Sequence, residues 1–482
     1  MSEETTLLWF RSDLRLTDHP ALQAAIDNND TVLPVYIHAP EEEAPWSLGG
    51  ASQWWLHQSL TSLQTSLRKL GSRMIVRRGP TLDSLRSLVK ETGAKRVLWN
   101  RRYEPHIIAR DSIIKESLRS EGIEAESFNS GLLHEPWTIC NQSRKPFQVF
   151  TPFWKTCLAK TEPGTTLGAP SQLQSPKDWP QGLTIDALAL EPKLPWASGF
   201  QSAWKPGEAG AALALTRFLE QSFEAYAEQR NRPDRVGTSR LSPHLHFGEI
   251  SPRQIWHAIQ KIAVRRKLPD AQWRSSQFVT ELGWREFAHH LLFHFPNTPT
   301  EPLRENFRNF PWHTNEPWLR AWQKGQTGYP IVDAGMRELW ATGWMHNRVR
   351  MIVASFLVKD LLISWTEGAR WFWDTLVDAD LAQNTLGWQW TAGCGADAAP
   401  YFRVFNPVSQ GEKFDPKGDY VRLWCPELTR VPEKWIHQPW SASAAILTQC
   451  GVKLGTNYPE RIVSHHTARE VALEAFARTR GR

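Results

Sequence analysis

Two hydrophobic patterns alternate along the first 130 residues of the chain. Apolar runs with the length of one buried strand occur at residues 6–10 (TLLWF), 31–37 (TVLPVYI), 73–78 (RMIVRR) and 96–100 (RVLWN). Between these runs, segments such as QWWLHQSLTSLQTSLRKLG have the apolar spacing of a helix. Strands that alternate with helices predict a parallel, doubly wound sheet, so we expect a Rossmann-like α/β domain.

The pattern changes after this region. From about residue 160 to 206, prolines and small polar residues interrupt every period, which predicts a connector laid over the surface rather than a packed element. From about residue 208 onward the apolar residues recur at helical spacing, most clearly in the long run from 334 to 365 (AGMRELWATGWMHNRVRMIVASFLVKDLLISW). We therefore predict an α/β domain over residues 1–130, a connector over 131–207 and a larger all-α domain over 208–482.

Composition gives a weak indication of the binding partner and of the cellular compartment. The chain has 56 basic against 50 acidic residues, a formal charge of +6. This charge weakly favours a polyanion such as nucleic acid, and an ordinary basic soluble protein fits it equally well. The five scattered cysteines, without a C-x-x-C motif, indicate neither a disulfide framework nor a zinc site. The acidic start MSEETT and the lack of a membrane-length apolar run predict a cytoplasmic protein without membrane contact.

The familiar nucleotide and hydrolase motifs are missing. No G-x-G-x-x-G or Walker loop follows any predicted strand, and no H-E-x-x-H or nucleophile-elbow sequence occurs. The adjacent pairs His289 with His290 and His465 with His466 lie on helical patterns, so the two side chains of each pair diverge and cannot chelate a metal together. We therefore predict no metal site.

One segment, residues 225–248, is a candidate anion site. Thr238, Ser239 and Ser242 follow Gly237 at a predicted helix start, where hydroxyl and backbone N–H groups can hold phosphate oxygens. Simple N-capping explains one of these hydroxyls. The additional hydroxyls, with several arginines nearby, favour anion binding over capping alone.

Two further helical motifs are ambiguous by themselves. In ELGWREF, Glu281, Trp284 and Arg285 share a helix face, as an exposed ion pair or as the wall of a pocket for a flat polar ligand. In GWMHNRVRM, Asn347 and Met351 share a face, and a capping asparagine beside a core methionine is the simpler interpretation. Spacing alone does not separate these alternatives.

Taken together, the motifs resemble the DNA photolyase and cryptochrome family. The matching segments are WFRSDLRLTDHPAL, GTSRLSP, ELGWREF, TGYPIVDAGMREL, GWMHNRVRMIVASFLVKDLLISW, GWQW and DAAPYFRVFNP, in the family's order over nearly the whole chain. The resemblance implies an N-terminal antenna domain and a helical domain that holds FAD. It also implies a light-driven lyase in which photoexcited, reduced FAD passes an electron to a pyrimidine dimer in UV-damaged DNA, single- or double-stranded.

The resemblance also implies roles for individual residues. Asn384 is expected to face the flavin N5, and Asp378 to pair with Arg350 and, with Asp380, to contact the flavin or adenosine hydroxyls. The complete set implied to bind FAD is Tyr226, Thr238, Ser239, Arg240, Leu241, Ser242, Arg285, Trp344, Arg350, Asp378, Asp380 and Asn384.

The same resemblance accounts for part of the unusual total of 26 tryptophans. Trp388, Trp365 and Trp312 match the family's chain for electron transfer to the flavin. Trp390 lies two residues from Trp388 and so points to another helix face. The implied contacts to the extruded lesion are Glu281, Trp284, Asn347, Met351 and Trp390, and the implied phosphate contacts are Lys155, Arg230, Arg348 and Arg403.

Alternatives within the family remain. Repair of (6-4) photoproducts uses histidines in the lesion pocket, whereas here Asn347 and Met351 face that place and His346 turns to another face, which favours cyclobutane dimers. The chain ends with FARTRGR and shows no long signalling tail, which favours repair over a cryptochrome-type sensor. A flavin-binding, DNA-associated sensor or redox module that never repairs is the remaining possibility. We expect a monomer.

The antenna chromophore is the least determined feature. SLGGASQWWLHQSL and SGLLHEPW resemble the N-terminal domains of plant cryptochromes and class III photolyases, which implies methenyltetrahydrofolate. However, His106 and Ile107 follow WNRRYEP, where class I enzymes carry amide and acidic contacts to the folate. 8-Hydroxy-5-deazaflavin, a second flavin or no antenna are the alternatives.

Overall fold

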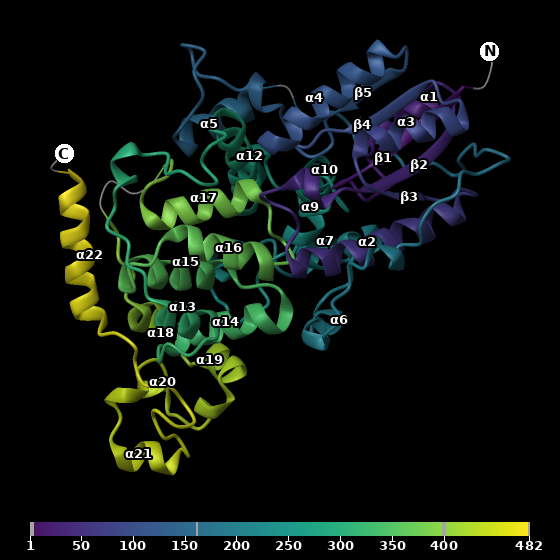
Figure 1. The fold of residues 1–482 in the computed structure, drawn as a ribbon. Coiled ribbons are helices and arrows are strands. Elements are labelled where there is room, and N and C mark those ends of the chain that lie inside the picture. The colour runs from purple at the N-terminus through teal and green to yellow at the C-terminus, as the bar shows by residue number, and fades with distance from the viewer. Residues whose placement is uncertain (1–3, 161, 398–401, 481–482) are drawn as a thin grey trace.

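The computed structural model describes residues 4–160, 162–397 and 402–480. The first three residues of MSEETT, the last two of FARTRGR and residues 398–401 of DAAPYFRVFNP lie outside the described residues. An α/β part forms one end of the molecule and a larger helical part forms the rest (Figure 1). The predicted fold class is confirmed, whereas the residues at which the domains divide stay a prediction.

The α/β part is built on a five-stranded parallel sheet in the order β3-β2-β1-β4-β5. Alternate residues of β1 face opposite sides: Leu7 and Trp9 pack with one buried cluster, and Leu8 and Phe10 with the other. Helices cover both faces, which confirms the doubly wound sheet. The strands are β1 (Thr5–Phe10), β2 (Thr31–His38), β3 (Ile75–Arg78), β4 (Arg96–Asn100) and β5 (Glu124–Phe128), and the helices are α1 (Pro20–Asp27), α2 (Gly50–Lys69), α3 (Thr81–Thr92) and α4 (Pro105–Ser120).

The edge strand β5 has no counterpart among the predicted apolar runs. Its sequence is EAESF, and Ala125 is its single fully buried residue. An edge strand pairs on one side and exposes much of its surface, so it needs no continuous apolar run.

The connector packs more closely than predicted. Leu173, Ile185, Leu188 and Phe200 are buried in the same cluster as α1 and α2, and the amide of Leu183 donates to the carbonyl of Val76 on β3 (2.9 Å). The expectation of a segment laid over the surface is therefore wrong for these four apolar residues, whereas Leu183 and Leu194 are exposed. Prolines remove periodicity but do not prevent irregularly spaced side chains from being buried.

The remaining helices form the larger part. They begin in the connector with α5 (Phe150–Ala159) and α6 (Phe200–Ala203) and continue with α7 (Glu208–Gln221), α8 (Tyr226–Gln229), α9 (Ser242–His246), α10 (Pro252–Arg265), α11 (Asp270–Arg274), α12 (Gln277–His294), α13 (Glu316–Gln323), α14 (Pro330–Thr342), α15 (Asn347–Ser355), the π-helical turn η6 (Phe356–Asp360), α16 (Trp365–Thr375), α17 (Leu381–Ala392), α18 (Pro407–Phe414), α19 (Asp419–Trp424), α20 (Glu433–Ile436), α21 (Ala444–Gln449) and α22 (His465–Arg480).

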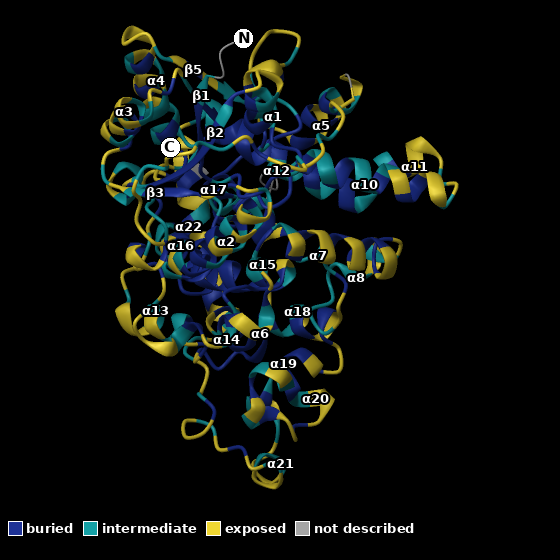
Figure 2. Cartoon of the chain, turned by 90° about the vertical axis from the view of Figure 1, so that its right-hand side faces the viewer, coloured by how far each residue is buried: buried dark blue, intermediate teal, exposed yellow. Residues whose placement is uncertain are grey.

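The long helical run at 334–365 is several elements rather than one. Gly343, in the left-handed region at φ 67°, ends α14, and the side chain of His346 accepts a hydrogen bond from the amide of Arg348 at the start of α15. These caps turn one periodic sequence into separate helices. As a result, α17 contacts both α15 and α16 around the large buried core (Figure 2).

Two classes of feature are absent from the described residues. No helix there combines the length and apolarity that a membrane crossing requires. No group of three or more His, Cys, Asp and Glu side chains there is arranged to hold a metal ion.

Candidate cofactor and DNA site

The two acids at residues 378 and 380 are each held by a basic partner. Asp378 lies between α16 and α17 and pairs with Arg350 of α15 at 2.8 Å, as the resemblance implied. Asp378 is 7% exposed, and a buried carboxylate needs such a partner. The predicted ion pair is confirmed.

The basic partner of Asp380 is a histidine that the sequence analysis did not identify. Its carboxylate caps α17 by accepting from the amide of Gln383 (2.9 Å) and lies 3.4 Å from Nε2 of His289 on α12. Burial alone would raise the pKa of Asp380, but His289, with help from Arg285, outweighs burial and holds this pKa below its usual range. Asp380 therefore remains ionised.

Asn384 lies one turn further along α17. Its side-chain amide donates to the carbonyl of Ala369 on α16 (3.0 Å), which fixes the plane of the amide. Asn384 is half-buried, so the rest of the amide remains available at the site.

The candidate anion segment contacts this group of helices through aromatic rings. The guanidinium of Arg240 lies over Trp204 (4.4 Å) and Trp344 (4.7 Å), and the indole of Trp344 donates to the hydroxyl of Ser242 (3.3 Å). Ser242 is the first residue of the short helix α9, whose N-cap Leu241 makes no side-chain cap. N-capping therefore does not account for these hydroxyls.

Several buried polar atoms at this place have no protein partner among the described residues. They are Nε of Arg240 and Nε2 of His246 and His346. Asp378 and Asp380 both act on the His246 pKa, which burial lowers overall, so His246 faces the same acids. Because buried polar atoms are normally paired, a polar ligand would satisfy them, and the residues present fit FAD. His246 had no signal in the sequence beyond its place in the anion segment.

The remaining residues of the implied FAD set lie around this place. Tyr226 packs its ring against Phe278 of α12 (5.2 Å), and burial raises its pKa. Arg285 donates to the carbonyl of Gly131 (2.6 Å), which ties α12 to the connector. Leu241 is buried, and the hydroxyl of Ser239 accepts from its amide (3.4 Å), while Thr238 is half-buried beside them.

The Glu281 side chain resolves one ambiguity of the sequence. Its carboxylate pairs with Arg230 at 2.8 Å, not with Arg285, so the exposed i,i+4 ion pair is wrong. Burial raises the pKa of Glu281 and Arg230 opposes this shift. Trp284, on the same helix, stacks on Phe150 of α5 with ring centroids 3.9 Å apart, a contact that sequence reasoning missed.

Asn347 is exposed and begins α15, and His346, not Asn347, is the N-cap. The interpretation of Asn347 as a capping residue is therefore wrong. Met351, four residues later, packs at the edge of the core and remains partly exposed. Burial lowers the pKa of His346 to about 3, so this imidazole is neutral at physiological pH.

The three tryptophans of the implied chain extend from the core outward. Trp388 and Trp365 are buried in the same cluster, and Trp312 packs against that cluster while partly exposed. The ring of Trp388 contacts Trp322, with centroids 6.2 Å apart. Trp322 is fully buried and was not singled out by the sequence. Trp390 packs against the same cluster and lines a small cavity whose wall does not include Trp388.

The implied phosphate contacts lie on elements that border the lesion-pocket residues. Lys155 lies exposed on α5, Arg230 follows α8, and Arg348 lies on α15 and donates to the side chain of Asn231 (2.7 Å). Burial lowers the pKa of Arg348, and Arg230 and Arg403 lower it further, so these three cations lie close together. A cluster of like charges of this kind suits a polyanion.

Comparison with known proteins shows clear similarity along the whole chain. Residues 6–175 match the family model described as DNA photolyase, and residues 278–478 match the FAD binding domain of DNA photolyase. A deoxyribodipyrimidine photo-lyase from Agrobacterium fabrum is 48% identical over 98% of this chain and 97% of its own length. Cryptochrome-2 from Arabidopsis thaliana is 42% identical over 99% of this chain and 79% of its own. The crystal structure of a bacterial class III photolyase from Agrobacterium tumefaciens superimposes with a TM-score of 0.96 at 47% identity, covering 100% of this chain and 99% of that one.

Proposed function

Because this chain belongs to the DNA photolyase family, we propose that it is a deoxyribodipyrimidine photo-lyase that uses light to split cyclobutane pyrimidine dimers in UV-damaged DNA. The observation that carries the proposal is the arrangement of α17. Its start holds Asp380 and Asn384 beside the Arg350–Asp378 pair, and its end presents Trp390 beside Arg403. One short helix thus links the candidate cofactor residues to the candidate DNA residues.

The cofactor part of the proposal assigns FAD to the first group. Reduced FAD, when bound and excited by light, supplies an electron to the lesion and accepts it back. Arg240 and the hydroxyls of Thr238, Ser239 and Ser242 hold the diphosphate, and the carboxylate of Asp378, paired with Arg350, accepts hydrogen bonds from ligand hydroxyls. Asn384 presents its amide to the flavin ring. Tyr226, Leu241, Arg285 and Trp344 enclose the ligand.

The lesion must leave the duplex to reach this site. Photolyases are among the enzymes for which extrusion of the damaged nucleotide is the established solution. Trp284, whose far face is covered by Phe150, and Trp390 offer flat surfaces for the bases. Glu281, held by Arg230, and Asn347 contact the polar base edges, and Met351 makes the apolar contact. Lys155, Arg230, Arg348 and Arg403 hold the phosphates.

Trp388, Trp365 and Trp312 form the path by which an oxidised cofactor is reduced under light. Their order from buried to partly exposed supports this role, because an electron from outside needs closely spaced aromatic rings that reach the surface.

For the antenna we propose methenyltetrahydrofolate, with 8-hydroxy-5-deazaflavin or no antenna as alternatives. The two segments that suggested it, 47–60 and 130–137, both border the helical part. The amide of Gly50 donates to Asp374 (2.9 Å), and the amide of Leu133 donates to Glu286 (3.0 Å). A chromophore held there would lie between the two parts. The absorption spectrum and the mass of the chromophore released from purified protein would identify it.

We also propose that the chain divides at residues 130 and 207, and that it acts as a monomer in the cytoplasm. The buried cluster on one face of the sheet and the large helical cluster share no residue, which supports the division, while a third cluster joins the sheet, the connector and the helical part.

The test is repair of a synthetic oligonucleotide that contains one cyclobutane thymine dimer. FAD-loaded, chemically reduced protein is illuminated with blue light or kept dark, and chromatography measures the returned thymines. We expect repair in the light and none in the dark. An otherwise identical oligonucleotide with a (6-4) lesion serves as the control substrate. Repair of the (6-4) lesion instead, or of neither, would overturn the proposal, and the second result would favour a light sensor.

A further inference from the structure

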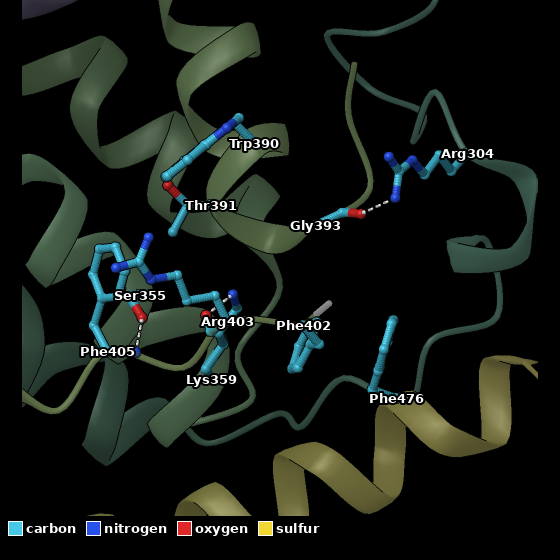
Figure 3. A pocket seen from close by; sticks show the side chains of 10 residues that line it. All are labelled: Arg304, Ser355, Lys359, Trp390, Thr391, Gly393, Phe402, Arg403, Phe405 and Phe476. Atoms are coloured by element: carbon cyan, nitrogen blue, oxygen red, sulfur yellow. Dashed lines mark hydrogen bonds between the residues drawn. The ribbon is translucent and has the colours of Figure 1, made fainter. Parts of the chain in front are cut away.

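A small cavity lies beside Trp390, between the end of α17, the turn η6, residues 402–405 and α22 (Figure 3). Its free volume is about 30 Å³, room for one or two water molecules and too small for a base or a nucleotide. The cavity is therefore not a ligand site. The relevant feature is the cavity wall, where the buried side chain of Lys359 contacts the backbone of residues 402–405, the segment that carries the proposed phosphate contact Arg403.

The turn η6 places two consecutive charged residues in the protein interior. Lys359 and Asp360 are each 4% exposed. Asp360 pairs with His465 at the start of α22, whereas the ammonium of Lys359 donates to the carbonyl of Arg403 and lies 4.4 Å from the ring centre of Phe402. π-Helical turns are rare and often occur at functional sites. Here the turn directs one charge to the C-terminal helix and the other to the segment at 402–405.

The segment from Phe402 to Phe405 is held on one side by α22 and α15, and on the other side the Arg403 guanidinium lies over the ring of Phe405, 5.1 Å from its centre. Phe402 stacks on Phe476 of α22 (4.6 Å), and the amide of Phe405 donates to the hydroxyl of Ser355 (3.3 Å). In contrast, the side chain of Arg403 is exposed. Figure 3 shows Lys359 below this backbone and the Arg403 guanidinium beside the ring of Phe405.

We propose that Lys359 is a positioning residue for DNA binding, because its hydrogen bond to the Arg403 carbonyl fixes the backbone from which the Arg403 guanidinium reaches a phosphate. Arg403 as a phosphate contact is part of the proposed function, on which this inference rests. Lys359 itself touches neither DNA nor the cofactor.

The charge on Lys359 makes this positioning dependent on pH. Burial lowers the pKa of Lys359 to about 7, while Asp360 and Cys394 raise it and Arg403 lowers it. Arg304 lies in the same cavity wall, and His465 faces Asp360 from α22. As pH rises through 7, the folded protein loses this proton. The charged hydrogen bond and the cation–π contact then weaken, so affinity for DNA should fall.

Stability should change in the opposite direction. The unfolded chain keeps the lysine proton up to its ordinary pKa of 10.5, so it binds more protons than the folded chain between pH 7 and 10.5. The free energy of unfolding therefore gains a contribution that rises with pH across this range. A residue with a purely structural role would make stability and affinity change together.

The first experiment compares the dissociation constants of FAD-loaded wild type and Lys359→Met for dimer-containing DNA from pH 6 to 8.5. We expect wild-type affinity to fall as pH rises, and the variant to bind about tenfold more weakly at pH 6, with little further change with pH. Lys434→Met on α20 is the matched control, since Lys434 is exposed and also lies over a tryptophan ring, 5.1 Å from Trp435. This control should follow wild type.

The second experiment measures proton uptake and coupling. Calorimetric binding in buffers of different ionisation enthalpy should show that wild type takes up a fraction of a proton at pH 7.5, and that Lys359→Met does not. Arg403→Gln should weaken DNA binding. The double variant, Lys359→Met with Arg403→Gln, should lose no more affinity than the single variant that binds DNA more weakly. Lys359→Arg, which keeps the charge, should restore affinity at pH 8.5.

The outcomes separate this inference from the proposed function. Wild type that binds dimer-containing and undamaged DNA equally would overturn the function itself. Wild type that prefers the dimer, with Lys359→Met showing the same affinity, pH profile and proton uptake, would overturn only the role of Lys359. If Lys359→Met does not fold, Lys359→Arg and the wild-type proton uptake still decide the matter.

Discussion

At the scale of single residues, the Arg350–Asp378 pair controls both stability and cofactor retention. The side chain of Asp378 is 2% exposed and that of Arg350 is 22% exposed. Asp378→Asn leaves the guanidinium without its counter-charge, so we expect the free energy of unfolding to fall by about 2–3 kcal/mol. Denaturant titration of FAD-free protein measures the stability, and the flavin-to-protein absorbance ratio measures retention, which should also fall.

The control for this prediction is an exposed pair. Asp419 lies 3.9 Å from Arg422 and its side chain is 61% exposed, so Asp419→Asn should change stability by less than about 0.5 kcal/mol. Equal losses in both variants would show that the buried pair has no special role.

Trp388 is the residue whose removal tests the electron path. Trp388→Phe keeps an aromatic ring in the core but removes the indole, so we expect it to abolish light-driven reduction of oxidised FAD. Repair by chemically reduced variant should remain close to wild type. Flavin absorbance under illumination measures the first quantity and dimer repair the second. The control variant Trp435→Phe, on α20, should show normal light-driven reduction of FAD. Normal photoreduction in Trp388→Phe would remove Trp388 from the path.

At the scale of elements, the close approach of α16 to α17 depends on one glycine. A Cβ atom on Gly368 would lie 2.0 Å from the ring of Trp388, and the backbone of α16 would have to move away from α17. We expect Gly368→Ala to lower the free energy of unfolding by roughly 1–3 kcal/mol and to disturb the tryptophan path with it. Denaturant titration and photoreduction measure the two effects.

Gly387 on α17 provides the comparison. A Cβ atom there meets nothing within 4 Å, so Gly387→Ala should be neutral or should stabilise the helix by up to about 1 kcal/mol. Equal effects of the two substitutions would indicate that helix propensity, rather than the contact with Trp388, governs α16.

At the scale of the whole molecule, the chain brings Arg230, Arg348 and Arg403 close together from three separate segments, and Lys155 is exposed on α5. Binding of dimer-containing duplex should therefore weaken as salt rises, with a slope of log K against log salt of about −0.9 for each phosphate neutralised. We expect Lys155→Gln to reduce the magnitude of this slope by about 0.9, without changing the preference for the dimer.

Lys324→Gln, at an exposed position after α13, is the control and should leave the slope unchanged. Affinity independent of salt in wild type would contradict the proposed phosphate contacts as a group.

Much of the fold could be predicted because it is encoded locally. Apolar runs located four of the five strands to within about two residues. The alternation of these strands with helices was sufficient to predict a parallel sheet. The fifth strand, EAESF, lacked an apolar run because it lies at the edge. The site residues could be assigned roles only through the family's motifs, since spacing alone left Glu281 and Asn347 ambiguous.

The sequence by itself determined four of the five strands, the helical character of the second part, the doubly wound class and the family, because periodicity and short motifs depend on neighbouring residues. Only the tertiary structure decided which charges meet. It pairs Glu281 with Arg230 rather than Arg285, Asp380 with His289, and Lys359 with the carbonyl of Arg403. It also buried several apolar residues of the proline-rich connector. These contacts join residues far apart in the chain, and their pairing follows from how helices pack, which no local pattern specifies.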